Sequence, residues 1–405
     1  MTEVIEKTEN KKGYKKTKLG WIPKDWDVIK LGNIATEIKD KVGKKQRIPM
    51  SLSAGKGFVA QAKKFGKDIA GKQYAQYTCL PPRTFAYNKG NSLKYPQGCI
   101  YQQPFNEEVA VPNVFICFVL DKNYCNNNFY EQLFKNNAQG KELFKYINSG
   151  VRNDGLLNLN DNNFFKIKLV LPPLKEQEKI AKILSAWDDG IETLEKLIEQ
   201  REILKKAIMQ KLFFEKESWQ MMRFDKIFKD FCKKNCPRER LLSATQENGV
   251  IPRDMLSGKV MSPEGSLEGY KLIEVGDFVI SLRSFQGGLE YSKYRGILSP
   301  AYTVLKNIID IDKDFYRHFF KSYNFIKKYL SISVIGIRDG KQVSYSDLSS
   351  VKIPYPPLEE QKKIGKILNC CDKEIQILNS KLEKLKEQKK GLMQKLLTGQ
   401  IRVKV

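Results

Sequence analysis

Two stretches of the chain carry hydrophobic residues at the alternating four- and three-residue spacing of a coiled-coil helix. Within 360–397 these residues are Ile364, Leu368, Cys371, Ile375, Leu378, Leu382, Leu385, Leu392 and Leu396; within 176–213 they are Ile180, Leu184, Trp187, Ile191, Leu194, Ile198, Ile208 and Leu212. This spacing places one apolar stripe along each helix and predicts that the stripe faces another helix. Lys389 interrupts the first stripe, and Arg201 and Lys205 interrupt the second. We expect the seam to loosen at the equivalent positions Lys205 and Lys389.

The two stretches are copies of one another. Residues 172–213 and 356–397 align without a gap and share 20 of 42 residues, starting with P-P-L-x-E-Q and ending with M-Q-K-L. The proline pair suits a first helical turn. At about 1.5 Å per residue, each helix should be roughly 55–60 Å long. The equal length and register favour an antiparallel pairing of the two helices; the alternative is that each packs only on its own domain.

The segments before the helices also match, although more loosely. Trp26 corresponds to Trp219, and the Ser51–Gly57 pair of positions corresponds to Ser243–Gly249. Further along, TFAYNK (84–89) falls on FVISLR (278–283), and GVR (150–152) falls on GIR (336–338). A repeat of this length predicts two halves of roughly 190 residues, each a globular segment followed by a helix.

The expected fold class is α+β. Two pseudo-symmetric globular domains, each a mixed β-sheet with helices, should be separated by two long helices that form an antiparallel coiled coil. The boundaries that we expect are an N-terminal tail (1–15), a first domain (16–158), a linker (159–171), a first helical region (172–214), a second domain (215–345), a linker (346–355), a second helical region (356–397) and a C-terminal tail (398–405).

Shorter patterns predict elements inside the globular segments. Runs of β-branched and aromatic residues indicate strands, and apolar residues at helical spacing indicate amphipathic helices. The expected strands are 113–120, 277–282, 301–306 and 328–332, and the expected helices are 129–147 and 314–330.

The charge balance points to a polyanionic partner. The chain has 71 Lys and Arg against 46 Asp and Glu, a formal charge of +25. Residues 176–213 hold seven bases and eight acids, and residues 360–397 hold ten and five, so most of the excess lies outside the helices. Nucleic acid or an anionic membrane surface would suit such a field. A proteome rich in lysine would give the same excess without any such partner.

Membrane, secretory and metal-binding classes are not supported. The longest apolar run, 114–120, is too short to cross a bilayer, and the N-terminus has no apolar signal core. The eight cysteines form no C-x-x-C pair and His318 is the single histidine, so we expect reduced thiols in the cytoplasm and neither a disulfide framework nor a zinc site.

Four polar, glycine-containing loops carry the chemistry that reads DNA bases. They are 53–67, 88–98, 243–253 and 283–296, and they lie at matching places in the two halves. Arg and Lys bond guanine edges, Asn and Gln bond adenine edges, and neighbouring Lys residues hold phosphates. The candidate DNA-binding residues are Ser51, Lys56, Lys89, Asn91, Lys94, Tyr95, Arg152, Ser243, Gln246, Asn248, Arg283, Ser284, Gln286, Arg295, Arg338 and Lys341.

Catalytic motifs are not found. The segment 66–73 has the spacing of a phosphate-binding loop, but Gln73 replaces the hydroxyl residue that would hold Mg²⁺. The sequence has neither N-P-P-[YF] nor F-x-G-x-G, which a self-sufficient adenine methyltransferase should carry. His318 lies in an aromatic-rich segment and is interpreted as a packing residue. We expect a non-catalytic chain with no catalytic residue, cofactor or metal of its own.

In the order of its parts the chain resembles the specificity subunit of Type I restriction–modification systems. The resemblance rests on P-P-L-x-E-Q-x-K-I-x-K-I-L before each long helix, on W-x-x-x-[KR]-[LF] at Trp26 and Trp219, on residues 276–305 and on the closing LLTGQIRV (396–403). It covers essentially the full length. It implies that each globular segment is a target recognition domain that reads one half of a split, asymmetric double-stranded DNA site.

The resemblance also implies partners. The antiparallel coil would set the spacing of the half-sites and dock two modification (methyltransferase) subunits, which carry the methyl donor, and two ATP-dependent restriction subunits would join them. The residues expected at the coil and partner interface are Ile180, Ile183, Leu184, Trp187, Ile191, Leu194, Ile198, Ile364, Ile367, Leu368, Ile375, Leu378, Leu382 and Leu385. Ile183, Leu197, Leu204, Ile367 and Ile377 lie off the stripe, where a partner helix would cover them. A scaffold without DNA specificity and a standalone enzyme are the competing interpretations.

Overall fold

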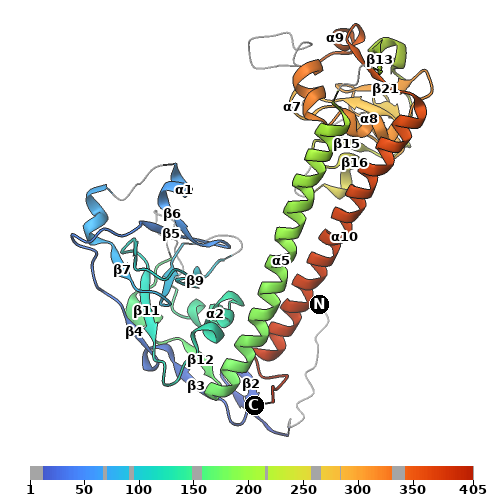
Figure 1. Cartoon of the computed structure of the whole chain (residues 1–405). Helices are drawn as coiled ribbons and strands as arrows, with labels where there is room; N and C mark the ends of the chain where they lie inside the picture. Colours follow the sequence, from blue (N-terminus) through green and yellow to red (C-terminus); the bar gives the residue numbers. More distant parts are fainter. Residues whose placement is uncertain are drawn as a thin grey trace. The chain divides into compact units, whose positions relative to one another are not determined.

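The computed structural model describes residues 12–66, 71–90, 95–147, 157–214, 218–256, 266–282, 284–330 and 343–404. The chain divides into two compact units: unit 1 comprises Met1–Thr193 with Leu382–Val405, and unit 2 comprises Leu194–Lys381. Each unit holds one globular segment and parts of both long helices (Figure 1). In the described part of the chain, no helix is both long enough and apolar enough to cross a membrane.

Unit 1 is built from short strands and helices that precede the first long helix. Its elements are β1 (Tyr14–Thr17), β2 (Gly20–Pro23), β3 (Asp27–Lys30), η1 (Leu31–Asn33), β4 (Ala35–Glu37), β5 (Met50–Ser53), β6 (Gly57–Ala60), α1 (Gln61–Phe65), η2 (Gly71–Gln76), β7 (Thr78–Leu80), β8 (Phe85–Asn88), β9 (Cys99–Gln102), β10 (Val109–Val111), β11 (Ile116–Leu120), α2 (Asn127–Lys135), α3 (Gly140–Phe144), α4 (Asp161–Phe164) and β12 (Lys168–Leu171). The long helix α5 (Leu174–Leu212) then leads into unit 2.

In the described residues of unit 2, the elements repeat this order from the equivalent of β3 onward. They are β13 (Gln220–Arg223), α6 (Phe224–Ile227), β14 (Phe228–Phe231), β15 (Leu242–Thr245), β16 (Gly249–Pro252), η3 (Arg253–Met255), β17 (Lys271–Ile273), β18 (Phe278–Ile280), α7 (Ser284–Gly287), β19 (Glu290–Tyr291), β20 (Gly296–Leu298), β21 (Thr303–Asn307), α8 (Lys313–Phe319), the π-helix η4 (Phe325–Leu330), α9 (Tyr345–Ser349) and β22 (Lys352–Tyr355). The second long helix α10 (Leu358–Leu396) returns to unit 1.

Each unit contains a four-stranded antiparallel sheet of the same order. In unit 1 the order is β4-β11-β8-β9, and in unit 2 it is β14-β21-β18-β19. Phe85 of β8 lies opposite Phe118 and Phe278 of β18 lies opposite Leu305, and all four side chains are buried. The repeat in the sequence therefore corresponds to a repeat in the fold, and the expected α+β class is confirmed.

An aromatic helix packs on each sheet. The sequence FYEQLFK of α2 and the sequence FYRHFFK that begins in α8 bury their aromatic residues in the two main hydrophobic cores. Tyr130 donates a hydrogen bond to the carbonyl of Val170 at 3.1 Å, and Tyr316 donates to the carbonyl of Pro354 at 3.0 Å. Because the same bond joins the helix to the last strand before each long helix, the two cores are built alike.

The repeated P-P-L-x-E-Q motif connects the start of each long helix to its globular segment. Glu176 is 1% exposed and accepts a hydrogen bond from the indole nitrogen of Trp26 at 2.8 Å. Glu360 accepts from the indole nitrogen of Trp219 at 3.0 Å. In unit 1 Glu176 also accepts hydrogen bonds from Nε and Nη2 of Arg402, and these bonds hold the C-terminal tail against the start of α5. The two repeated tryptophans are therefore buried partners of repeated glutamates.

The glutamine of the motif fixes a second connection. Gln177 accepts a hydrogen bond from the backbone N–H of Asn126 at 2.8 Å and donates to the carbonyl of Pro172. Gln361 accepts from the N–H of Asp312 at 2.9 Å and donates to the carbonyl of Pro356. Asn126 and Asp312 are the N-caps of α2 and α8. Each long helix is thereby tied to the aromatic helix of its own unit.

The long helices run antiparallel within each unit (Figure 1). In unit 1 Lys389 of α10 forms an ion pair with Asp188 of α5, and in unit 2 Lys205 of α5 forms an ion pair with Asp372 of α10. The prediction that the seam loosens at these lysines was wrong, because each lysine contributes a polar contact between the helices. Such pairs are invisible in an apolar pattern, which registers only the missing hydrophobic residue.

Several expected elements differ from the structure. Residues 328–330 of the expected strand 328–332 belong to η4, whereas 331–332 lie outside the described residues. The expected helix 129–147 is two helices, α2 and α3, because the intervening Asn137 has a positive φ of 55°. Likewise, 314–330 divides into α8 and η4. The strands at 113–120, 277–282 and 301–306 are present as β11, β18 and β21.

The segments expected as linkers carry strands. Within 159–171, β12 pairs with β3, and within 346–355, β22 pairs with β13. Each of these strands has four residues, too few for a periodic pattern to stand out. In each unit the last strand before the long helix thus pairs with a strand from the beginning of the globular segment.

Candidate nucleic-acid interface and partner surface

In unit 1 the predicted recognition loops lie together. The turn of the β5–β6 hairpin, Ser53–Gly57, contains two glycines with φ of 80° and 74°, which a residue with a side chain rarely adopts. The hydroxyl of Tyr101, on β9, accepts a hydrogen bond from the N–H of Gly55 at 2.8 Å. Asn88, at the end of β8, donates to the carbonyl of Leu52 at 2.8 Å. The hairpin is therefore attached to the end of β8 and to β9.

The candidate residues of unit 1 differ in how far they can reach a ligand. Lys56 is exposed at the tip of the turn. Tyr95 is half-buried beside Tyr101, to which it is hydrogen-bonded, and burial raises the pKa of Tyr101. Ser51 is buried and accepts a hydrogen bond from Lys64, and Lys89 pairs with Asp161 at 3.0 Å. Of these four, Lys56 and Tyr95 are best placed for contact.

Unit 2 brings the equivalent loops together with different residues. Gln246 and Asn248 are exposed in the turn of the β15–β16 hairpin, and Ser243 is half-buried in β15. The turn is closed by Thr245, whose hydroxyl accepts from the N–H of Asn248 and donates to the carbonyl of Gly249. Gly249 has a φ of 69°, and a Cβ there would lie 2.7 Å from the carbonyl oxygen of Tyr291. The turn therefore packs directly against β19.

The loop between β18 and β19 contains the short helix α7. Ser284 is buried, and its hydroxyl accepts a hydrogen bond from the N–H of Ser281 at 2.8 Å, so its role in the loop is structural. Gln286 is exposed on α7. Arg295 forms ion pairs with Glu239 at 2.9 Å and with Glu274 at 3.2 Å, so its charge is already neutralised by residues of its own unit. Gln286 is thus the best-presented of these three candidates.

A pocket of about 570 Å³ lies between the two loops of unit 2. Its lining combines the polar Gln246, Glu247 and Asn248 of the hairpin turn with the apolar Met255 and Leu282 and the aromatic Tyr302. Polar side chains beside apolar and aromatic ones suit the edge and the face of a nucleobase.

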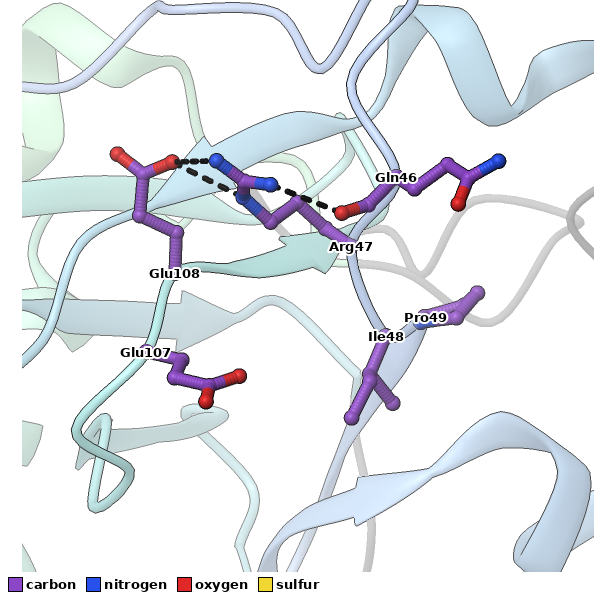
Figure 2. Close-up of a pocket in the computed structure, with 6 residues that line it drawn as sticks. All are labelled: Gln46, Arg47, Ile48, Pro49, Glu107 and Glu108. Carbon is purple, nitrogen blue, oxygen red and sulfur yellow. Dashed lines mark hydrogen bonds and ion pairs between the residues drawn. The ribbon is translucent and has the colours of Figure 1, made fainter.

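A larger pocket in unit 1, of about 670 Å³, does not have this character (Figure 2). Its arginine is occupied: Nε and Nη2 of Arg47 donate to one oxygen of Glu108 at 3.0 and 2.7 Å, and Cys79 donates to the same oxygen at 3.3 Å. The hydrogen bond from Arg47 lowers the pKa of Glu108, so this carboxylate stays charged. Glu107 adds a second carboxylate. Lys45 lies 3.9 Å from the Glu108 carboxylate, so two bases face two acids here and a phosphate would meet no excess of positive charge.

The remaining candidates lie outside the described residues. They are Asn91, Lys94, Arg152, Arg283, Arg338 and Lys341. Their role in DNA binding stays a prediction from the sequence. Among the described residues no cluster of His, Cys, Asp or Glu has the composition to hold a metal ion.

Along the long helices, the predicted seam positions lie inward. Ile180, Leu184, Leu194, Ile198, Ile364, Leu368 and Leu382 are buried, and Trp187, Ile191, Ile375, Leu378 and Leu385 are half-buried. These residues cover one another or their own domains, which leaves the off-stripe positions as the candidates for partner contact.

The off-stripe positions are not equivalent in the two units. In unit 2 Leu204, Ile367 and Ile377 are 46%, 45% and 66% exposed. The neighbouring Ile203, which we did not single out in the sequence, is also exposed. In contrast, Ile183 is half-buried against the core of unit 1, and Leu197 is half-buried in unit 2. The expected pseudo-symmetric pair of Ile183 and Ile367 therefore consists of one packed and one exposed residue.

Three side chains that hold the loops were missed in the sequence. Asn88 and Tyr101 attach the hairpin of unit 1, and Lys321 contacts both loops of unit 2. In the sequence Lys321 follows a helical pattern and would be interpreted as an exposed lysine at a helix end. Only the tertiary structure shows that it contacts the two loops. The interpretation of His318 as a packing residue agrees with its position: it is buried beside Asn369, at the place that Gln132 occupies in unit 1.

Comparisons with known proteins give a consistent result. The profile of the Type I restriction modification DNA specificity domain matches residues 23–202 and again 216–387. The putative MjaX specificity subunit of Methanocaldococcus jannaschii is 28% identical, over 96% of this chain and 97% of the relative. The MjaVIII specificity subunit of the same organism is 29% identical, over 95% of this chain and 94% of the relative.

Two solved structures share the fold. One comes from a study of complex assembly and conformational transition of the Type I restriction–modification system; its TM-score is 0.59 at 14% identity, covering 94% of this chain and 99% of that chain. The other is the Type I restriction–modification S subunit from M. genitalium, with a TM-score of 0.54 at 16% identity, covering 92% and 96%. The doubled family match over most of the chain establishes the family, and the chain belongs to the Type I restriction–modification specificity subunits, which are non-catalytic DNA-recognition components.

Proposed function

We propose that this chain directs a Type I restriction–modification complex to a bipartite, asymmetric double-stranded DNA site, with unit 1 reading one half and unit 2 the other. One observation carries the proposal. In unit 1 the β5–β6 hairpin is held against the end of β8 and β9, and in unit 2 the β15–β16 hairpin is held against the segment that follows β18. The two sheets have the same fold, but the side chains that these segments expose differ. Equivalent placement supports a shared task, and different side chains support different targets.

The chemistry of the turns supports unequal half-sites. The turn of unit 1 exposes Lys56, whose ammonium can bond a guanine edge or a phosphate. The turn of unit 2 exposes Gln246 and Asn248, whose amides can bond the two edge atoms of adenine. The charge of +25 adds an attraction for the DNA backbone that does not depend on sequence.

The exposed apolar residues of the long helices support partner docking. Ile203, Leu204, Ile367 and Ile377 lie outside the seam of unit 2, and leaving apolar surface in water costs about 25 cal/mol per Å². We assign these residues to contacts with helices of the modification subunits. Each complex would contain two modification subunits, and two restriction subunits would bind to them. The methyl donor and ATP would then bind the partners, and the complex would act on DNA in the cytoplasm.

A domain exchange tests the proposal. Residues 16–158 are replaced by the first domain of a relative with a different site, and the modified DNA of the reconstituted complex is sequenced. One half of the recognised site should change while the other half and the gap stay the same. The reciprocal exchange of residues 215–345 should change the other half alone. A scaffold without DNA specificity would leave the site unchanged in both exchanges.

A further inference from the structure

Lys321, just after α8, is bound to three separate segments of unit 2. Its ammonium donates to both carboxylate oxygens of Glu290 at 2.7 Å, to the carbonyl of Gly287 at 3.0 Å and to the carbonyl of Gln246 at 3.3 Å. Glu290 lies on β19, is 1% exposed and has its pKa raised by that burial. The lysine therefore supplies the opposite charge to a buried carboxylate and, with the same atom, reaches two loops.

Those two loops are the ones that carry the exposed recognition candidates. Gln246 lies at the turn of the β15–β16 hairpin, and Gly287 ends α7 in the β18–β19 loop. They pack tightly, because a Cβ added at Gly287 would come within 2.9 Å of the side chain of Gln246. A Cβ at Gly288, whose φ is 76°, would lie 1.8 Å from the carbonyl oxygen of Phe320. The hairpin, the α7 loop and the end of α8 thus meet at Lys321.

The corresponding lysine of unit 1 has a different role. Lys135 ends the sequence FYEQLFK as Lys321 ends FYRHFFK, but it pairs with Glu131, one turn earlier on its own helix, at 2.9 Å. In unit 1 the hairpin is held by Tyr101 and Asn88. The attachment of loops through this lysine is therefore a property of unit 2, and Lys135 offers a matched control.

We propose that Lys321 is a positioning residue that fixes the hairpin turn and the α7 loop of unit 2 relative to each other, and thereby determines the half-site that this unit reads. The inference rests on the proposed function. An ammonium bound to both loops holds their backbones in one arrangement, so Gln246, Asn248 and Gln286 approach the bases with a fixed spacing. Without it, the loops would still carry the same side chains but in variable positions.

Two variants separate positioning from the stability of the ion pair. Lys321→Met alone would leave Glu290 charged and buried without its partner, which threatens folding. Glu290→Gln keeps the size of the side chain and leaves the bonds from Lys321 to both carbonyls. Lys321→Met/Glu290→Gln differs from it only at the lysine. Lys135→Met, in the full complex, controls for loss of a lysine at the equivalent helix position.

The readout is the set of DNA sequences modified by the reconstituted complex on a library with both half-sites randomised. Glu290→Gln should keep the wild-type preference. Lys321→Met/Glu290→Gln should lose about tenfold or more of its discrimination in the unit 2 half-site, since a positioned side chain can distinguish bases by that factor, while the unit 1 half-site is unchanged. Lys135→Met should change neither half-site. Unchanged discrimination by the double variant would overturn the inference.

Hydrogen exchange provides the second readout. In the double variant the amides of 245–249 and 284–288 should exchange faster, with β18 and β21 protected as before. A uniform loss of protection across unit 2 would overturn the inference, because the lysine would then hold the whole unit rather than the loops. If the unaltered complex showed no preference for a split site, the proposed function itself would be refuted. This outcome is distinct from the failure of the inference about Lys321, which the variants alone would reveal.

Discussion

The polar contact between the long helices in unit 1 should contribute measurably to stability. Lys389 is almost buried, with a side chain 11% exposed, and it is paired with Asp188, whose side chain is 40% exposed. Gln132 of α2 completes the contact by donating to Asp188 at 2.7 Å and accepting from Lys389 at 3.4 Å. One lysine therefore joins both long helices and the globular segment of unit 1.

Replacing Lys389 with methionine removes the charge and keeps most of the side-chain volume. Breaking a fully buried pair costs about 3–5 kcal/mol, whereas exposed pairs contribute about 0.2–1 kcal/mol. Because water and Gln132 can still solvate Asp188, we expect a loss of about 1–2 kcal/mol in the free energy of unfolding.

The equivalent change in unit 2 should cost less. Lys205 is 23% exposed, and its partner Asp372 keeps Arg317 at 3.5 Å. We expect Lys205→Met to lose about 0.5 kcal/mol. Lys390→Met, at an exposed position beside Lys389, serves as the control and should be near neutral.

Urea unfolding followed by far-ultraviolet circular dichroism measures the three variants. The order of destabilisation should be Lys389→Met, then Lys205→Met, then Lys390→Met. If Lys389→Met were as harmless as the control, the contact would not stabilise the helix pair. If Lys205→Met cost more than Lys389→Met, the argument from exposure and remaining partners would be refuted.

Three further predictions concern spacing, partners and pH. Inserting one heptad into both long helices should lengthen the unread gap between the half-sites in whole base pairs without changing their bases, as modified-site sequencing would show; an unchanged gap would argue against a ruler. Ile367→Asp should weaken binding of modification subunits in size-exclusion chromatography, whereas Ile183→Asp should chiefly destabilise unit 1; full assembly of the Ile367 variant would place the partner elsewhere. Burial lowers the pKa of His318 to about 4 from its usual 6.5, so the folded state binds fewer protons than the unfolded state. The free energy of unfolding should therefore fall by about 1.4 kcal/mol per pH unit as the pH drops from 6.5 towards 4. His318→Gln should remove this dependence in acid unfolding curves, and an unaltered pH profile would contradict the lowered pKa of His318.

The sequence was informative where one interaction repeats along the chain. The heptad stripes predicted the two helices and their seam, because a single apolar face satisfies the same packing requirement at every turn. The internal repeat predicted two similar folds, and the sheets β4-β11-β8-β9 and β14-β21-β18-β19 confirm it. The loops expected at 53–67 and 243–253 are in part hairpins, because β6 and β16 lie within them, and the matched Gly57 and Gly249 both have a positive φ.

The sequence was uninformative where distant polar residues meet. The glutamate of P-P-L-x-E-Q accepts from a tryptophan about 150 residues earlier in the chain, and nothing local in the motif announces that partner. Lys321 contacts Gln246 and Glu290, which belong to two other segments. The same limitation explains Ser51 and Arg295, which suit DNA contact by residue type but are occupied by Lys64 and by two glutamates in the fold.

The proposal that each unit recognises one half-site is tested most directly by mapping methylated bases across the host genome with and without this gene. The account predicts a methylated motif of two different half-sites separated by a fixed unread gap, present only when the gene is intact. It also predicts that exchanging residues 16–158 alters one half of that motif. Methylation that is the same in both strains, or a continuous motif without a gap, would contradict the assignment of one half-site to each unit.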